Sequence, residues 1–220
     1  MVPNRTDFTR RELEIIESCR TPRQVQRFLT SIPYNREKEE KTCLSFRGVV
    51  RHNKAHCLEG ALSAAVILEQ HNYPPLVISL ESQDKLDHVL FLYQSNGFYG
   101  TVARSRDLGL HGRKPVFRTI RALVMSYFDP YIDKTGRITG YAVADLRELG
   151  NYDWRLSDRN VWKVERYLQV IPHHEIRSSD SRFEKWRSRY LEYKRKYPDR
   201  QLNYFQDKRC WLVYSLPDSK

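Results

Sequence analysis

The sequence predicts an α+β fold, with helices toward both ends of the chain and an antiparallel sheet between them. Segments with the apolar spacing of helices flank a middle region of short β-branched and aromatic runs. The dipeptide Asn96-Gly97 separates two of these runs and is the strongest short signal for a β-hairpin. A chain of 220 residues with 40% hydrophobic content can also bury a core without disulfides or metals.

Two helices are expected before the middle region. The first covers residues 7–19. The second begins at Pro22, which suits the first helical position, with Thr21 as its N-cap, and it stops at Pro33. The stretch "NREKEEKTC" that follows is expected to be an exposed, charged connector.

An Ala-rich helix is expected to begin near Cys57 and to end before Pro74, because proline cannot continue a helix. Its small residues Ala61, Ala64 and Ala65 allow it to lie close against a sheet. The pattern therefore predicts that the start of this helix is held near a strand.

Asn53 is the expected N-cap of that helix. Glu59 lies in its first turn, where a carboxylate suits the helix dipole. His52 and His56 are four residues apart and would share a helical face, where a metal site with Cys57 is conceivable. No fourth ligand is evident, so the sequence favours no metal site.

Three strands are expected next, in "LVISLES", "DHVLFLYQ" and "GFYGTVARS". The hairpin signal pairs residues Asp87–Tyr93 with residues Phe98–Arg104 in antiparallel fashion.

The remaining chain should supply one more strand and three helices. In order, these are the helix "KPVFRTIRALVMSYF", the strand "GRITGYAVADL", and the helices "NVWKVERYLQVI" and "SRFEKWRSRYLEYKRKY". The aromatic residues of the last helix follow the helical period, which is typical of a docking face. We expect an N-terminal helical segment (1–42), a core (43–176) and a basic C-terminal helical segment (177–220) packed on the same core.

Composition indicates a soluble, cytoplasmic protein without a membrane-spanning segment. The four cysteines are widely spaced, as is usual in a reducing compartment. The first residues lack the apolar core of a signal peptide, and the longest apolar run, "ALSAAVIL", has only eight residues. The net charge is +11, and basic residues concentrate between Arg182 and Arg209, a pattern that favours polyanions.

Cys57 carries the chemistry that the sequence suggests. A thiol at a helix N-terminus faces unpaired N–H groups and the positive end of the helix dipole, and both lower its pKa. His88, in the strand that follows, is the natural imidazole partner. Such a pair is what nucleophilic acyl chemistry requires.

The ordered stretches "HCLEGALSAAVILEQHNYPPLVISL", "DHVLFLY" and "GFYGTVARS" resemble the transglutaminase-like superfamily of papain-like cysteine enzymes, and in particular a bacterial branch of it. The resemblance covers about residues 43–128. It implies a Cys-bearing helix on an antiparallel sheet, with Cys57 as nucleophile and His88 as general base and acid. It requires no cofactor, and the sequence contains no acidic calcium loop.

The third catalytic member departs from the family pattern. Where the family places an orienting Asp, this chain has Ala103. Thr101, Ser105 or Asp107 could instead accept the N–H of His88. Loss of the orienting residue weakens catalysis without removing the nucleophile and base.

The sequence favours an enzyme that acts on a peptide or protein through a thioester on Cys57, by acyl transfer or amide hydrolysis. Arg113, Lys114 and Arg118 are candidates for holding an acidic substrate at the rim of the cleft. The alternative is that they belong to an ordinary solvated surface without a substrate. One alternative, suggested by Ala103, is a catalytically impaired member that binds peptides or proteins. A second alternative is a basic protein that associates with nucleic acid, but no motif for reading bases is present.

Overall fold

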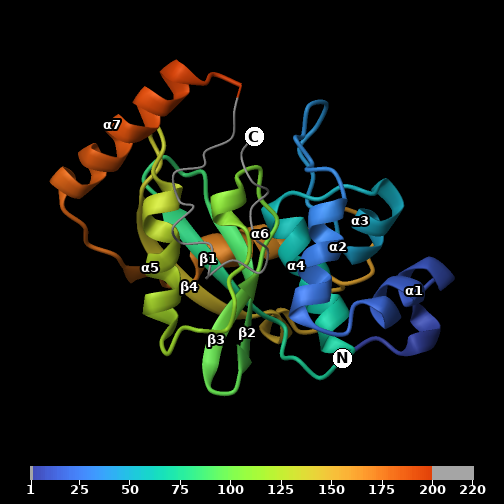
Figure 1. The fold of residues 1–220 in the computed structure, drawn as a ribbon. Helices are drawn as coiled ribbons and strands as arrows, with labels where there is room; N and C mark the ends of the chain where they lie inside the picture. Colours follow the sequence, from blue (N-terminus) through green and yellow to red (C-terminus); the bar gives the residue numbers. More distant parts are fainter. Residues whose placement is uncertain (1, 200–220) are drawn as a thin grey trace.

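The computed structural model describes residues 2–199 and shows an α+β protein built on one antiparallel sheet (Figure 1). The helices are α1 (Arg10–Ser18), α2 (Pro22–Ser31), α3 (Phe46–His52), α4 (Cys57–Glu69), α5 (Ile120–Tyr131), α6 (Trp162–Val170) and α7 (Asp180–Lys196). The strands are β1 (Leu76–Ser82), β2 (His88–Ser95), β3 (Phe98–Val102), β4 (Ile138–Asp145) and β5 (His174–Glu175), in the sheet order β3-β2-β1-β4-β5. The α+β prediction is therefore confirmed.

The centre of the sheet is buried on both faces, and the residues of β2 alternate between the two cores. Val89, Phe91 and Tyr93 belong to the core shared with α4, whereas Leu90 and Leu92 belong to the core shared with α5. Figure 1 shows α5 on one side of the sheet and α4 with α2 on the other. A strand covered on both faces reads as a continuous apolar run, which is what "HVLFLY" is.

The hairpin is confirmed. β2 and β3 pair antiparallel with Ser95 opposite Phe98. Asn96 and Gly97 between them have φ angles of 50° and 78°. Two consecutive positive φ values are the conformation that favours Asn-Gly in a two-residue hairpin turn.

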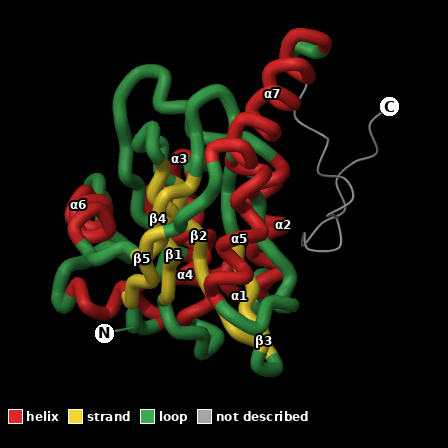
Figure 2. Tube along the Cα trace, turned by 90° about the vertical axis from the view of Figure 1, so that its left-hand side faces the viewer, coloured by secondary structure: helices red, strands yellow, loops and turns green. Residues whose placement is uncertain are grey.

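The first part of the last helix packs on the core through two of its aromatic residues. Phe183 is buried in the core on the α5 side of the sheet, and Trp186 packs against it. The C-terminal end of α7 projects from the body of the protein in both views (Figures 1 and 2). The expected basic segment continues to Arg209, and residues 200–209 lie outside the described part, as does Cys210. No helix within residues 2–199 has the length and apolar character needed to cross a membrane.

The structure differs from the expectation at α3, at α5 and at β5, a two-residue strand that the sequence did not predict. Residues Phe46–His52 form α3, which the sequence did not predict, and Asn53 ends it with a left-handed φ of 50° instead of capping α4. His52 and His56 therefore do not share a helical face. α5 begins at Ile120, because the side chain of Thr119 accepts a hydrogen bond from the Ala122 N–H and caps it there.

The small residues of α4 do let it approach the sheet closely. Ala61, Ala64 and Ala65 are fully buried in the core that α4 shares with β2. A Cβ atom on Gly60 would lie 2.7 Å from the Cβ of Arg104, just beyond the end of β3. The position of the first turn of α4 therefore depends on the absence of a side chain at Gly60.

Gly60→Ala is expected to lower the free energy of unfolding by about 1–3 kcal/mol, because the added methyl group must displace Arg104 or the helix. Urea denaturation measures the loss. Ser63→Ala, one turn further along the same helix, removes an atom instead of adding one and serves as the control. A Gly60→Ala protein as stable as the wild type would show that α4 can shift freely at this contact.

Candidate functional site: a thiol between two imidazoles

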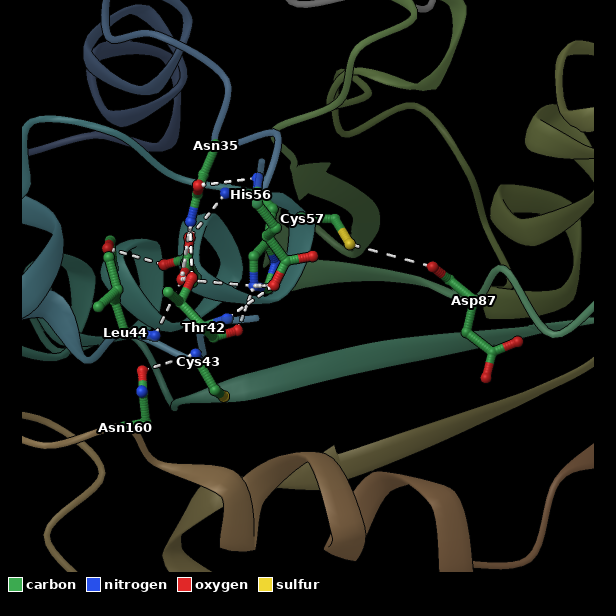
Figure 3. A network of polar contacts seen from close by, with 11 residues as sticks. Asn35, Thr42, Cys43, Leu44, His56, Cys57, Asp87 and Asn160 are labelled. Carbon is green, nitrogen blue, oxygen red and sulfur yellow. Dashed lines mark hydrogen bonds and ion pairs between the residues drawn. The ribbon is translucent and has the colours of Figure 1, made fainter. Parts of the chain in front are cut away.

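Cys57 and His88 are brought together by the packing of α4 against β2. Cys57 is the first residue of α4, and its Sγ lies 4.0 Å from the carbonyl oxygen of Asp87, the residue before His88 (Figure 3). The thiol is only partly exposed. Cys57 and Asp87 are thus in contact although they are 30 residues apart in the sequence.

The pKa of Cys57 is well below that of an ordinary thiol. Burial alone raises it, but hydrogen bonds from the imidazoles of His56 and His88, and the positive charge that these rings can carry, outweigh the burial. The thiol is therefore prepared to act as a thiolate, the nucleophilic form of cysteine.

His88 is held by a main-chain carbonyl. The ring is 4% exposed, and its Nε2 lies 3.0 Å from the carbonyl oxygen of Leu110. Because a carbonyl oxygen only accepts hydrogen bonds, Nε2 carries the hydrogen and Nδ1 remains for the sulfur of Cys57. The Leu110 carbonyl thus fixes which ring nitrogen of His88 carries the hydrogen.

The three residues expected to orient His88 have other contacts. The Thr101 hydroxyl lies 2.5 Å from the Tyr127 hydroxyl, inside the core. The Ser105 hydroxyl accepts a hydrogen bond from the Asp107 N–H. The Asp107 carboxyl lies near enough to His88 to interact electrostatically, although burial raises its pKa. The structure therefore gives the imidazole N–H a backbone partner instead of any of these side chains.

Arg113 is not at the rim of the cleft, contrary to the expectation from its charge. It is 1% exposed, and its guanidinium donates hydrogen bonds to the carbonyls of Gly109 at 2.6 Å and His111 at 2.7 Å. These two residues flank Leu110. Its planar group also stacks on the ring of Tyr127, with the guanidinium carbon 3.9 Å from the ring centre. Arg113 therefore holds the turn that supplies the carbonyl for His88.

Lys114 and Arg118 are exposed, but they stand apart from the cleft beside Cys57. That cleft has a volume of about 1040 Å³. Besides Cys57, His56 and His88, its lining includes Tyr34, Lys41, Asp107, Tyr131, Trp162 and Tyr190. The lining therefore combines charges of both signs with several aromatic rings.

His56, which the sequence suggested only as a metal ligand, is a second imidazole beside Cys57. Its Nε2 lies 3.0 Å from the carbonyl oxygen of Thr42 and 3.4 Å from Oε1 of Glu59. Burial lowers the pKa of His56, but the hydrogen bond to Cys57 and the charges of Cys57 and Glu59 outweigh it and raise the pKa to about 9. The signal in the sequence was the spacing His56-Cys57-x-Glu59, which places a carboxylate one turn after the histidine.

Glu59 lies at the centre of a buried network of hydrogen bonds. It is 0% exposed, and its carboxylate accepts hydrogen bonds from the N–H groups of His56 and Leu44, the Thr42 hydroxyl and the Asn35 amide. These donors give the buried carboxylate oxygens of Glu59 the hydrogen-bond partners that a buried polar group requires. Among residues 2–199, no group of three or more His, Cys, Asp or Glu side chains is arranged to hold a metal ion.

The fold and the site together define an α+β protein with a thiol–imidazole centre at the meeting point of a helix N-terminus and a sheet. No protein-family model and no curated protein matches the chain. Among solved structures, the calcium-bound LapG of Legionella pneumophila is similar at 9% identity and a TM-score of 0.36, over 71% of this chain and 87% of LapG. At that TM-score the likeness does not carry an argument, so the class rests on the geometry.

Proposed function

We propose that the protein is a thiol-dependent acyl transferase or amide hydrolase of the transglutaminase-like class, acting on peptide or protein substrates. The observation that supports this most directly is the partly exposed Cys57 at the start of α4, beside an imidazole, His88, that the Leu110 carbonyl fixes. The cleft around the sulfur gives a peptide chain access to it.

In the first step, the Cys57 thiolate attacks the carbonyl carbon of an amide and forms a tetrahedral intermediate. The unpaired N–H groups at the start of a helix stabilise the oxyanion. The carbon–nitrogen bond then breaks, the departing amine takes a proton from an imidazolium of the site, and the acyl group remains on Cys57 as a thioester.

In the second step, water or an amine attacks the thioester, and the thiolate of Cys57 leaves. His88 accepts the proton of the attacking group through Nδ1, because its Nε2–H is committed to the Leu110 carbonyl. Attack by water gives hydrolysis or deamidation, and attack by an amine gives a cross-link.

The test is to trap the thioester. The protein is incubated with a mixed peptide digest and a small fluorescent amine, quenched in acid and examined by mass spectrometry. An acyl adduct is expected on Cys57 and is expected to disappear in Cys57→Ser. His88→Gln is expected to slow turnover by about a hundredfold or more, since general acid–base catalysis contributes that much. Cys19→Ser, which changes a buried thiol elsewhere in the core, is the matched control.

Peptides that bind in the cleft without forming an adduct or losing an amide bond would contradict this proposal. They would identify the protein as a peptide-binding module instead.

A further inference from the structure

Cys57 has two imidazole neighbours whose hydrogen bonds are arranged in the same way. Nε2 of His56 meets the Thr42 carbonyl at 3.0 Å, and Nε2 of His88 meets the Leu110 carbonyl at 3.0 Å. Since carbonyl oxygens only accept, both Nε2 atoms carry hydrogen in every protonation state. In each ring, Nδ1 is the nitrogen that remains able to take up a proton.

The charges around the two rings are different. Oε1 of the buried Glu59 lies 3.4 Å from Nε2 of His56, and Oε1 of Glu37 lies 4.0 Å from the same atom. Nε2 of His88 has the uncharged Leu110 carbonyl in the corresponding place. A carboxylate beside an imidazole favours the imidazolium, and a carbonyl does so far less.

We propose that the proton of the Cys57 thiol resides on His56, so that the resting ion pair is Cys57–His56 and His88 stays neutral. The proton moves from Sγ to Nδ1 of His56, and the negative charge stays on Sγ. Resting on the proposed function, this divides the catalytic work between the two rings. His56 donates its proton to the departing amine when the carbon–nitrogen bond breaks, and neutral His88 accepts the proton of the attacking water.

After deacylation, the proton returns from His88 to His56 by way of the sulfur, which restores the starting state. Two imidazoles in opposite protonation states thereby serve as acid and base, each set by its own surroundings.

The two phenols near Cys57 do not supply the positive charge. Tyr34 and Tyr131 both interact electrostatically with the sulfur, and burial raises the pKa of each phenol. They are therefore neutral at the pH where the thiolate forms. Asp107 faces His88, but burial raises the pKa of its carboxyl group. Its negative charge therefore stabilises an imidazolium at His88 less than an ordinary carboxylate would.

The experiment measures the rate at which iodoacetamide alkylates Cys57 as a function of pH, read by peptide mass spectrometry. In the wild type, the reaction is expected to remain fast well below the pH at which ordinary thiols ionise. His56→Gln keeps an N–H donor for the Thr42 carbonyl but removes the charge. It is expected to slow alkylation by about tenfold or more near pH 6, because a shift of one pKa unit changes the thiolate fraction tenfold.

His88→Gln is expected to shift this profile much less, and His52→Gln, which changes an exposed histidine four residues earlier, is expected not to shift it. A second readout follows the ring protons by NMR. The imidazolium of His56 is expected to persist to about pH 9 and to lose this stability in Cys57→Ala.

The opposite result would overturn the assignment of the proton to His56. In that case His88→Gln shifts the pH dependence of the alkylation rate, and His56→Gln leaves it unchanged. Alkylation does not require an acyl substrate, so this result is independent of whether the thioester is formed.

Discussion

Arg113→Met is expected to lower the free energy of unfolding by about 3–5 kcal/mol, although the substitution lies outside the cleft. Methionine fills a similar volume but donates no hydrogen bond. The carbonyls of Gly109 and Ser126 then lose a buried donor, and so does the Ser126 hydroxyl. Urea denaturation measures the loss.

The same substitution is expected to affect His88 through the turn that Arg113 holds. Without the guanidinium between Gly109 and His111, the Leu110 carbonyl is less firmly placed, and Nε2–H loses its fixed acceptor. NMR of the imidazole nitrogens is expected to show a mixture of tautomers for His88 in place of the single one.

Lys114→Met is the matched control, because it removes the same charge from the next residue, which is exposed. It is expected to change the stability by less than about 0.5 kcal/mol. If Arg113→Met left both the stability and the His88 tautomer as in the wild type, Arg113 would be no more than a buried cation.

The pairing of Cys57 with His88 could be predicted because local signals place both residues. The Asn96-Gly97 turn fixes the hairpin that begins at His88, and the small residues of α4 allow its start to reach that strand. Each signal acts over a few residues, and the antiparallel sheet then leaves little freedom in how they meet. The sequence thus predicts the helix and the strand directly. The contact between them is an inference from these two elements.

The partner that orients His88 could not be predicted from side chains. Every residue has a carbonyl, so nothing distinguishes Leu110 in the sequence. The expected hydroxyl or carboxylate partner near Ala103 is therefore wrong, because the structure gives the His88 N–H a backbone acceptor instead.

Charge gave a wrong expectation for Arg113 for a related reason. Its charge and its basic neighbours resemble a solvated surface, and the carbonyls that satisfy the guanidinium belong to a turn that only the fold creates. α3 was missed because its seven residues are too few for a helical period to emerge, and its N-cap Ser45 is a single residue. Because α3 was not predicted, Asn53 was expected to cap the start of α4, whereas it ends α3.

His111 is expected to make the protein sensitive to acid. The side chain is buried, and burial together with the nearby positive charges of Arg104 and Arg113 lowers its pKa from 6.5 to about 4. Between these values the unfolded chain binds a proton that the folded protein does not, so stability falls as the pH falls. The loss attributable to His111 is about 3 kcal/mol on acidification from pH 6.5 to 4.

The measurement is urea denaturation at several pH values in that window, for the wild type and for His111→Gln. Glutamine still donates to the carbonyl of Ser105, as Nε2 of His111 does, but it does not titrate. Carboxylates that titrate in the same window contribute equally to both proteins and cancel in the difference. His52→Gln, at an exposed position, is expected to retain the wild-type slope.

Parallel pH profiles for the wild type and His111→Gln would mean that His111 is protonated in the folded state. That result would also place a positive charge next to Leu110, on the turn that holds His88 by its Nε2–H. The expected neutral His111 instead keeps the surroundings of His88 free of a further charge down to about pH 4. The acid sensitivity of the fold and the availability of His88 as a base therefore depend on the same buried turn.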